Sequence, residues 1–559
     1  MTNDILKTKT LCEVLRHRAE YQKDKLFCTV VEHKSEQSIT FGELYDHACQ
    51  YGGAMRSLGL ETGERVAVML PTSMEFLFSF YGAMLAGLVP AAVSPPFMPR
   101  KIEFFAKERA GLLNGIGACA LIASKQSGKA AAAIKSGVPG MRHFLTPEDI
   151  EQCSRTLDPD LKILPQDMAM IQFSSGSGGR QKGVVLTHKN LFSNVTAVHL
   201  AMGTVPDDVI VIWLPLYHDM GLIGCVCHAL FVGCELVLMS PNTFIASPGF
   251  WLRVMHEKSG TIGVAPNFGY QLCIDRNGKF KPGEIDLSRW RMALNGAEMV
   301  TEDTVAGFVE KFGPSGFRRQ TFMPVYGLAE ATLAVCFTPP NTGYLTDRIN
   351  LKGLVTKGIA EPAGNGGGNI SFVSVGKHIP GVEVKIVDKT GTEVGERVQG
   401  RLLTRSSSVM SEYFNDPVAT GKVLKDGWLD TGDLAYRVDD YIFVTGRFKD
   451  VIIKAGRNYS PERIEQAVWS VPGIRKHSVA AFGVLSRDKG TENIVVMAEA
   501  RVREKEDSGK LVLAVKQAIS KRIELTPDEV IIVRPQTIPK TTSGKVQRAL
   551  CRRLYLKGK

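Results

Sequence analysis

Short β-rich runs alternate with amphipathic helical stretches through most of the chain, and this alternation restricts the folds that it can adopt. Helical spacing of apolar residues is found at 41–58 and 248–258, for example. Runs of apolar and β-branched residues predict buried strands at 65–70, 118–123, 209–214, 235–239 and 261–265. Strands and helices in this order are typical of parallel sheets covered by helices. The sequence therefore predicts an α/β fold.

The pattern changes near residue 373. From there to residue 444, short strand runs lie between turns with little helix, which predicts a small β-barrel or sandwich. A charged turn, Arg447-Phe448-Lys449-Asp450, comes next, and residues 451–559 then show an α+β pattern. A chain of 559 residues is too long for a single core. We therefore expect at least two domains, with a hinge at the charged turn.

The composition indicates a globular protein of a reducing compartment. Hydrophobic residues make up 44% of the chain and charged residues 22%, and the eleven cysteines show no framework spacing. No signal peptide is recognisable in the polar N-terminal stretch. The longest uncharged run, residues 76–99, holds glycines and prolines, so it predicts a buried helix ending near Gly87 and then a strand. We thus expect a cytoplasmic protein without a transmembrane segment.

The chain is basic, with 68 Lys and Arg residues against 57 Asp and Glu residues and a net charge of +11. A basic protein can attract nucleic acid, anionic lipid or an acidic protein, and it can equally have a basic surface with no specific partner. The last nineteen residues hold six of these cations and no acid. No nucleic-acid-binding motif accompanies them, so we expect no nucleic acid partner.

One cysteine cluster invites a metal interpretation. Cys225-Val226-Cys227-His228 is followed by Cys234, but the neighbouring residues are apolar and no second ligand pair is present. We expect these cysteines to pack in the core.

Two segments far apart in the chain combine glycine and hydroxyl residues with a lysine. They are Ser174-Ser175-Gly176-Ser177-Gly178-Gly179-Arg180-Gln181-Lys182-Gly183 and Lys540-Thr541-Thr542-Ser543-Gly544-Lys545. A flexible backbone of this kind can wrap phosphate, and the lysine adds positive charge. Neither segment has the glycine-lysine spacing of the Walker pattern. The pair therefore predicts a nucleotide-using enzyme of another kind, with one lysine supplied from a separate C-terminal unit.

Five stretches in order resemble the adenylate-forming superfamily of acyl-CoA synthetases, luciferases and peptide-synthetase adenylation domains. Besides the two lysine segments they are residues 326–330 (Tyr-Gly-Leu-Ala-Glu), 428–433 (Trp-Leu-Asp-Thr-Gly-Asp) and 446–450 (Gly-Arg-Phe-Lys-Asp). Their order and spacing match across nearly the whole chain. The resemblance implies a large N-terminal domain of two helix-covered, parallel-type sheets plus a small β-barrel, followed by a small mobile α+β domain.

Within the superfamily, the chain resembles the fatty acyl-AMP ligases most closely, through residues 213–224, 265–268, 295–298 and 326–333. Residues 337–372 resemble the extra segment by which these ligases differ from acyl-CoA synthetases. The implied organisation is an N-terminal adenylation domain (1–446), a hinge (447–450) and a C-terminal lid domain (451–559). The subregions implied within the first domain are 1–170, 171–372 and 373–446.

The reaction that the resemblance implies is attack of a fatty acid carboxylate on the α-phosphate of ATP, giving acyl-AMP and pyrophosphate. A carboxylate is ionised at neutral pH, so such a site needs positive charge, backbone donors and Mg²⁺ rather than a general base. Gly178 and Gln181 stand where the family has Thr and Pro. The residues implied to hold the phosphates are Ser174, Ser175, Gly176, Ser177, Gly178, Gly179 and Lys182.

The remaining nucleotide contacts come from four further stretches. Glu330 is expected to coordinate Mg²⁺, which prefers oxygen ligands. Asp433 is expected to accept the ribose hydroxyls, and Arg447 to add positive charge nearby. The residues implied around the adenine are Asn295, Gly296, Ala297, Tyr326 and Gly327.

The catalytic residues implied by the resemblance are Lys545, Glu330 and His218. Lys545 would bridge the acyl carboxylate and the α-phosphate, and His218 would border the acyl and nucleotide sites. Asp450 matches the family's hinge, about which the C-terminal domain would rotate. His218-Asp219 could also be taken for half of a hydrolase triad, but no Gly-x-Ser-x-Gly elbow accompanies it.

The acyl tunnel is harder to place in the sequence. Its candidates are equally well explained as ordinary core, and they are Met220, Leu222, Ile223, Phe268 and Gly269.

The leading functional hypothesis is a fatty acyl-AMP ligase that loads the phosphopantetheine thiol of an acyl carrier protein, or of a carrier domain of a polyketide or peptide synthase. Because carrier proteins are acidic, the basic C-terminal stretch is suited to docking one. An acyl-CoA synthetase that uses free CoA is the alternative. A third hypothesis, a non-catalytic acyl-adenylate binder, comes from the altered phosphate loop, and the presence of Glu330, Asp433 and Lys545 argues against it.

Overall fold

A largely parallel sheet at the centre of the protein carries many of the predicted strands. The computed structural model describes residues 2–96, 102–153, 155, 157, 161–174, 181–276, 280, 283–364, 368–454, 457–486, 491–501, 505–523, 525–541 and 544–557. Within this part of the chain the largest sheet has the order β17-β14-β13-β12-β11-β9-β10-β1-β2, and neighbours from β13 to β1 are parallel. Its strands are β1 (Leu26–Glu32), β2 (Ser35–Thr40), β9 (Val209–Ile212), β10 (Glu235–Leu238), β11 (Ile262–Pro266), β12 (Met292–Gly296), β13 (Phe322–Gly327), β14 (Ala334–Phe337) and β17 (Lys377–His378).

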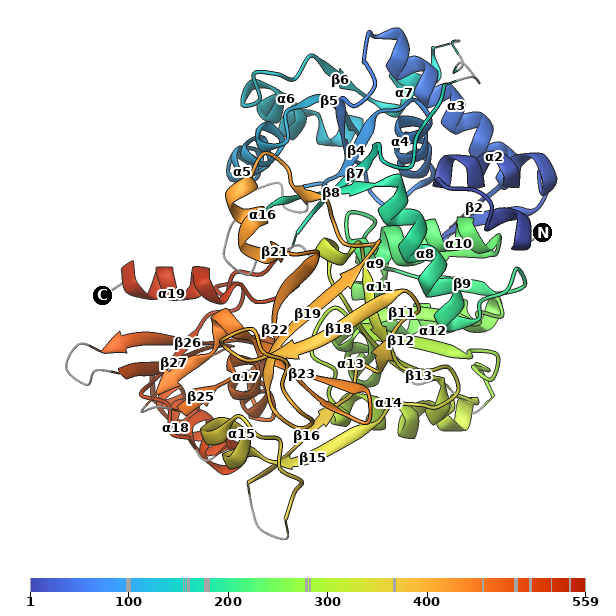
Figure 1. Cartoon of the computed structure of the whole chain (residues 1–559). Coiled ribbons are helices and arrows are strands. Elements are labelled where there is room, and N and C mark those ends of the chain that lie inside the picture. Colours follow the sequence, from blue (N-terminus) through green and yellow to red (C-terminus); the bar gives the residue numbers. More distant parts are fainter. Residues whose placement is uncertain are drawn as a thin grey trace.

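A second parallel sheet, of order β4-β3-β5-β6, lies in the blue and teal part of Figure 1. Helices cover both sheets, and a short antiparallel sheet of order β20-β8-β7 lies between them. The strands are β3 (Arg65–Met69), β4 (Val89–Ala92), β5 (Ala118–Ala123), β6 (His143–Leu145), β7 (Met168–Phe173), β8 (Gly183–Thr187) and β20 (Glu412–Tyr413). The main covering helices are α2 (Leu11–Tyr21), α3 (Phe41–Ser57), α4 (Met74–Leu85), α5 (Ile102–Gly115), α6 (Gly128–Ser136), α8 (His188–Met202), α10 (His228–Val232), α12 (Pro248–Glu257), α13 (Asn267–Arg276) and α14 (Glu302–Phe312).

The predicted strands and helices are confirmed, each boundary to within two residues, because local signals specify them. Helix α3 begins where the Thr40 hydroxyl accepts the Glu43 backbone N–H and the Glu43 carboxylate accepts the Thr40 N–H. The uncharged run forms α4, which ends before Gly87, and then β4. Gly87 has φ +68°, a conformation that favours glycine. One feature of the fold was not predicted: β1 and β2 leave the N-terminal subregion and extend the nine-stranded sheet beside β10.

The predicted β-rich region is one curled antiparallel sheet, drawn in orange in Figure 1. Its strands are β18 (Val382–Val387), β19 (Gly400–Ser406), β21 (Leu424–Lys425), β22 (Trp428–Val438) and β23 (Tyr441–Arg447). A seven-residue helix, α16 (Pro417–Val423), interrupts it where little helix was expected. The Asp416 side chain caps this helix by accepting the Ala419 N–H, and Pro417 occupies its first turn.

Residues 337–372, the expected insertion, form a small unit on this curled sheet. Strands β15 (Thr346–Asn350) and β16 (Asn369–Val373) pair antiparallel, and α15 (Leu351–Lys357) follows β15. Ile349, Leu354 and Phe372 share a core with Tyr436 and Phe443 of β22 and β23. Leu351 and Val355, on α15, pack instead against the core of the C-terminal unit. The insertion therefore touches both the curled sheet and the C-terminal unit.

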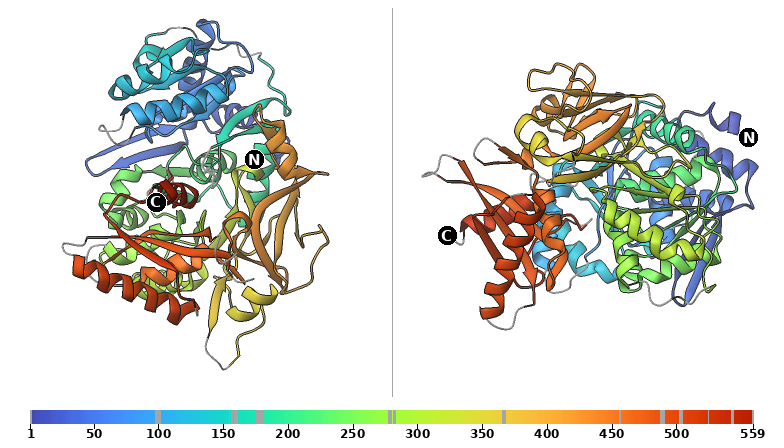
Figure 2. Two further views of the ribbon diagram at one scale, coloured as in Figure 1. Left: turned by 90° about the vertical axis from the view of Figure 1, so that its left-hand side faces the viewer. Right: turned by 90° about the horizontal axis from the view of Figure 1, so that it is seen from below.

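Residues 452–557 form an α+β unit with its own core, shown in red in Figure 2. Its antiparallel pair β26–β27 is joined by the parallel strand β28. It follows a one-turn helix, η7 (Phe448–Asp450). The elements are β24 (Ile452–Lys454), β25 (Arg457–Tyr459), α17 (Pro461–Trp469), β26 (Ile474–Ser486), β27 (Thr491–Ala500), α18 (Lys505–Ile523), β28 (Glu529–Val533) and α19 (Arg548–Lys557).

Arg548 ties this unit together at its junction with η7. Its guanidinium donates to both carboxylate oxygens of Glu465, at 2.7 and 2.8 Å. It also lies 3.0 Å from Asp450 Oδ2 and 2.6 Å from Glu462 Oε1. One cation thus compensates three carboxylates that come from η7 and α17, so the start of α19 is fixed to the predicted hinge residue.

We predict that Arg548→Met destabilises the C-terminal unit by about 3 kcal/mol, because three partly buried carboxylates lose their cation. Hydrogen exchange in peptides of β26 and β27 measures this loss as faster local opening. The matched control is Arg552→Met, which removes an exposed arginine from the same helix. Equal exchange in the two variants would show that the Arg548 cluster does not stabilise the unit.

Candidate active site

Four neighbouring parallel strands end at one edge of the central sheet and bring distant segments together. Strands β9, β11, β12 and β13 are parallel and adjacent. The segments that leave their carboxyl ends begin at Trp213, Asn267, Ala297 and Leu328. Open α/β sheets bind ligands at this edge. Four of the stretches singled out in the sequence therefore meet at one place.

A cavity of about 1250 Å³ lies at this edge, and the C-terminal unit closes part of it. Its volume exceeds the ~300–1,000 Å³ of an ordinary small-molecule site, so it has room for more than one substrate. Its lining includes apolar residues, among them Trp213, Met220, Pro241, Ile245, Phe268 and Leu272. It also includes charged residues, called the charged side below, among them Lys182, Asp219, Glu298, Glu330, Arg447 and Lys545.

Pro241 and Ile245 of α11 (Pro241–Ala246) and Phe268 and Leu272 of α13 line one part of the cavity, called the apolar branch below, together with the polar residues Asn242, Gln271, Asp275 and Arg276. Phe268, Leu272 and Arg276 lie four residues apart on α13, so one face of this helix follows the branch along about 12 Å. Lys476 of the C-terminal unit lies 3.4 Å from Asp275 at the far end. The branch is suited to an extended apolar chain.

The tunnel candidates separate into two groups. Met220 and Phe268 line the cavity, whereas Leu222 and Ile223 are buried in the main core and are not among its lining residues. At Gly269, a Cβ atom would lie 2.6 Å from the Trp213 ring, so this glycine allows the close approach of α13 to Trp213. Trp213 itself stacks on Phe244 with ring centroids 3.7 Å apart.

Ser174 and Lys182 form the base of the predicted phosphate loop. The Ser174 N–H donates to the Lys182 carbonyl at 2.9 Å, and the Lys182 N–H donates to Ser174 Oγ at 3.3 Å. Both residues line the cavity. Gln181 accepts a hydrogen bond from Arg109 of α5 at 3.1 Å, and Arg109 is 5% exposed. The loop residues Ser175, Gly176, Ser177, Gly178 and Gly179 lie outside the described residues.

Glu330 lies on a one-turn helix, η6 (Ala329–Ala331), which leaves β13 through Gly327. A side chain at Gly327 would lie 1.7 Å from the Leu333 carbonyl oxygen, so glycine is required for the chain to fold back here. Glu330 lines the cavity, and its carboxylate accepts a hydrogen bond from Tyr413 at 2.8 Å. Tyr413 was not among the residues singled out in the sequence.

Asp433 and Tyr326 lie next to the cavity lining and support it. Tyr326 donates to Asp433 Oδ2 at 2.6 Å, and Arg447 Nε lies 3.3 Å from Asp433 Oδ1. Burial raises the pKa of Asp433, while Arg447 and Tyr326 act in the opposite direction. Arg447 lines the cavity, as do Thr431 and Gly432 just before Asp433.

The end of β12 turns sharply into the cavity. Ala297, a lining residue, has φ +65°, a strained conformation for a residue with a Cβ. Glu298 also lines the cavity and accepts the Phe268 N–H at the start of α13 at 2.6 Å. Asn295 and Gly296 are buried in β12, where the Asn295 amide donates to Asn267 at 3.2 Å. Neither of them is among the residues that line the cavity.

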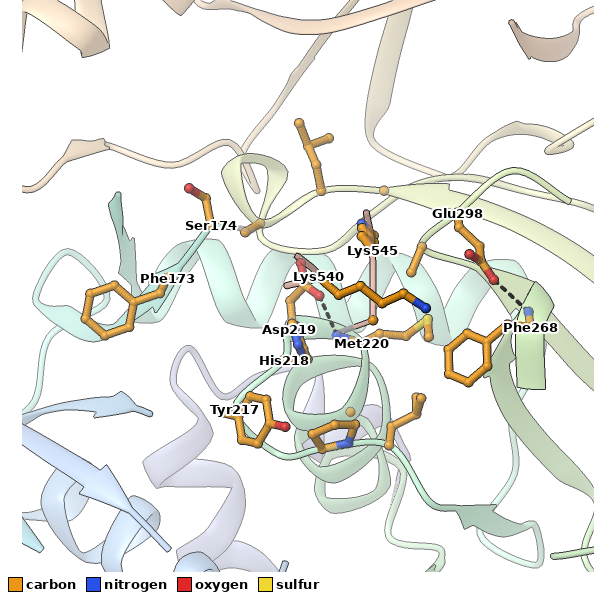
Figure 3. Close-up of a pocket in the computed structure, with 18 of the residues that line it drawn as sticks. Phe173, Ser174, Tyr217, His218, Asp219, Met220, Phe268, Glu298, Lys540 and Lys545 are labelled. Carbon is orange, nitrogen blue, oxygen red and sulfur yellow. Dashed lines mark hydrogen bonds between the residues drawn. The ribbon is translucent and has the colours of Figure 1, made fainter. Parts of the chain in front are cut away.

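A tight turn brings Lys545 into the cavity from the C-terminal unit. The Thr541 N–H donates to the Lys545 carbonyl at 2.7 Å, and Lys540 pairs with Val546 across the turn. Figure 3 shows Lys540 and Lys545 in the cavity near Asp219, Met220 and Glu298. Burial lowers the pKa of Lys545 and Arg447 lowers it further, whereas the carboxylates of Asp219 and Glu298 raise it.

His218 and Asp450, the remaining predicted residues, lie in the cavity lining and at the end of η7, respectively. His218 lines the cavity, and burial lowers its pKa to about 3, with Lys545 adding to the effect. The imidazole is therefore neutral at neutral pH. Asp450 ends η7 and pairs with Arg548, as described above. The described residues of the predicted site thus either line one cavity or lie next to residues that line it.

Sequence reasoning missed several polar residues of the cavity. Asp219 follows His218 directly and Glu298 follows Ala297, so their neighbourhood could have identified them. Burial raises the pKa of both carboxyl groups. Lys540, whose ammonium group donates to Ser478 at 2.9 Å, was noted as part of a motif but given no role.

The donors present fit a magnesium ion held jointly with a nucleotide. Among the described residues, no group of three or more His, Cys, Asp or Glu side chains could hold a metal ion. Mg²⁺ is usually bound by one or two carboxylates together with substrate phosphates, which is what Glu330 beside Lys182 offers. The cysteines near His228 pack in the core, and the His228 ring contacts Thr204 at 3.2 Å.

Among the described residues, no helix is long and apolar enough to cross a bilayer.

Comparison with known proteins gives consistent matches over the whole chain. The family described as AMP-binding enzyme matches residues 15–414. The chain is 30% identical to a putative acyl-CoA synthetase of Caulobacter vibrioides, covering 93% of this chain and 91% of the relative. It is 30% identical to the medium-chain-fatty-acid–[acyl-carrier-protein] ligase JamA of Moorena producens, covering 98% and 95%. A solved structure from studies of fatty acyl-adenylate ligases from E. coli and L. pneumophila matches with TM-score 0.92 and 31% identity, covering 99% and 98%.

We predict that Glu298→Gln raises the melting temperature at pH 7.5 by about 1–3 °C. The expected gain is this small because the Glu298 side chain is partly exposed, so solvent screens its charge. The pKa of Glu298 is raised in the folded protein, so its ionised form costs stability above the unfolded pKa. Glutamine keeps an oxygen for the Phe268 N–H without the charge. The gain should shrink at pH 5, as the wild-type carboxyl group takes up its proton.

Thermal unfolding at the two pH values measures this effect. Glu310→Gln, which changes an exposed residue of α14, is the control and should leave the melting temperature unchanged. A lower melting temperature for Glu298→Gln at pH 7.5 would contradict the prediction.

Proposed function

Because this chain belongs to the AMP-binding enzyme family, we propose that it activates a fatty acid as acyl-adenylate and passes the acyl group to a carrier protein thiol. The chain is a ligase of the adenylate-forming kind. The observation that carries the proposal is the position of Lys545. This ammonium group enters, from the C-terminal unit, a cavity whose lining includes both charged and apolar residues (Figure 3).

The charged side is proposed to bind ATP and the apolar branch the fatty acid chain. Lys182 and the loop before it would hold the phosphates, while Asp433, fixed by Tyr326 and Arg447, would accept the ribose hydroxyls. Ala297 and Gly327 would form the adenine wall, with Asn295, Gly296 and Tyr326 supporting it. The fatty acid carboxylate would then lie near Lys545 and His218, with its chain along α13.

Adenylate formation in this cavity needs no general base. The carboxylate attacks the α-phosphate, and pyrophosphate leaves as the new O–P bond forms. Lys545 would stabilise the charge that develops between the two anions. His218, neutral at neutral pH, would contribute contact rather than proton transfer. Mg²⁺ bound at Glu330 would neutralise phosphate charge when it is present.

The acceptor of the acyl group is proposed to be a phosphopantetheine thiol on an acyl carrier protein or carrier domain. The insertion supports this choice over free CoA, because α15 packs on the C-terminal unit and the Arg463 guanidinium lies 3.8 Å above the Phe372 ring. These contacts would resist rotation of residues 451–559 about Asp450, the motion proposed to open a thiol channel. A carrier protein would supply binding energy that free CoA lacks.

The proposed location is the cytoplasm. All eleven cysteines are free thiols, which supports a reducing compartment.

Product analysis tests the proposed function. The protein is incubated with ATP, Mg²⁺ and a medium-chain fatty acid, with either CoA or a phosphopantetheinylated carrier protein added. We expect acyl-AMP that accumulates with CoA and is consumed with the carrier. Acyl-CoA as the main product would identify a synthetase instead. Absence of adenylate with every fatty acid tested would favour the non-catalytic binder.

We predict that Lys545→Met lowers pyrophosphate exchange into ATP by ~10²–10³, because the charge between the two anions is lost. Lys557→Met is the control, since Lys557 is an exposed lysine of the same unit, at the end of α19 and away from the cavity lining. It should retain most of the exchange. Equal losses in both variants would argue against a specific role for Lys545.

We further predict that Leu351→Asp with Val355→Asp increases acyl-CoA formation by about tenfold, because charge on this face of α15 weakens its contact with the C-terminal unit. Pyrophosphate exchange should change little. Lys352→Asp, on the exposed side of the same helix, controls for charge alone. If CoA use stays unchanged while the contact is loosened, as judged by hydrogen exchange in β25, the insertion does not decide the acceptor.

A further inference from the structure

Tyr413 lies where the phosphate loop, the Glu330 helix and the curled sheet meet. Its side chain is 5% exposed and lines the inner wall of the cavity. It comes from β20, a two-residue strand that was not among the stretches singled out in the sequence. The pairing of this strand with β8 fixes the position of the residue.

The backbone around Tyr413 is fixed on both sides. Tyr413 pairs with Val184 in β8, and the Phe414 N–H donates to the Gly183 carbonyl at 2.8 Å, directly after Lys182. Three residues before Tyr413, the Met410 N–H donates to the carbonyl of Glu330, also at 2.8 Å. One short segment thus bridges the backbone at both charged residues.

The Tyr413 side chain also contacts both charged residues, Glu330 and Lys182. Its hydroxyl donates to Glu330 Oε1 at 2.8 Å, which orients the carboxylate, and within the described part of the chain no hydrogen bond reaches Oε2. The ammonium group of Lys182 lies 4.1 Å from the centre of the same ring, within cation–π distance.

We propose that Tyr413 is a positioning residue that holds the Glu330 carboxylate and the Lys182 ammonium group at a constant separation, so that both face the same magnesium nucleotide. The inference rests on the roles proposed above for Glu330 and Lys182. The ring supports the phosphate side and the hydroxyl supports the metal side, so the two contributions can be removed one at a time.

ATP binding measured by calorimetry, with Mg²⁺ and with EDTA, tests the proposal without turnover. Tyr413→Phe keeps the ring and loses the hydroxyl. We expect its affinity for ATP with Mg²⁺ to fall about tenfold, while its affinity in EDTA stays as in the wild type. Tyr413→Leu also removes the ring, so its affinity should fall under both conditions.

Tyr436→Phe is the matched control. Tyr436 is fully buried and donates to the Asp347 carboxylate at 3.0 Å in the curled sheet, so it loses the same kind of bond away from the cavity. It should bind ATP like the wild type under both conditions.

Two results would overturn the proposal. One is that Mg²⁺ strengthens ATP binding to Tyr413→Phe as much as it strengthens ATP binding to the wild type. The other is an equal loss of affinity with and without Mg²⁺, which would indicate a general structural role. If the wild type binds magnesium ATP yet forms no adenylate, the proposed function fails while the role of Tyr413 is still decided by these binding data. If Mg²⁺ does not strengthen ATP binding to the wild type, the proposal fails together with the role of Glu330.

Discussion

The structure depends on one buried ammonium group that reaches from one unit into a cavity formed by another. Removing Lys545 from water is unfavourable, and this is why its pKa is lowered. The carboxylates of Asp219 and Glu298 partly compensate it, while their own pKa values are raised by the same burial. A tight turn, the Arg548 cluster and the insertion all help to hold the C-terminal unit in the position that this contact requires. The site is therefore a set of mutually compensated charges whose balance a bound anion would change.

Local periodicity was enough to predict most of the fold. Apolar runs such as 118–123 became buried strands, and stretches such as 41–58 became helices with the caps that their sequences offer. The local pattern could not show which distant segments pair with each other. The pairing of β1 with β10 joins an N-terminal hairpin to the central sheet, and nothing in residues 26–40 specifies that partner. Helix α16 had a recognisable Asp-Pro start, but it is short enough to be missed among strands.

The candidate site likewise contains residues that the local sequence identified and residues that it did not. Glu330, Asp433 and Lys545 were identified because each stands in a stretch with a distinctive order of residues, and the structure places each at one cavity or directly against its lining. Tyr413 and Arg109 were not identified, because each acts through a contact with a residue more than seventy positions away. Such residues have ordinary surroundings in the sequence. Their importance becomes visible when the distances between side chains are known.

The way in which the insertion is attached has a consequence for how such enzymes diversify. Strands β14 and β17 pair antiparallel, with Phe337 opposite Lys377, so all the residues between them amount to the loop of a hairpin. A hairpin loop can be lengthened, shortened or exchanged without changing the register of the strands that carry it. The segment proposed to influence the acceptor is thus separable from the sheet that carries the adenylation residues. Acceptor preference could change by exchange of a single module while the chemistry of activation is inherited intact.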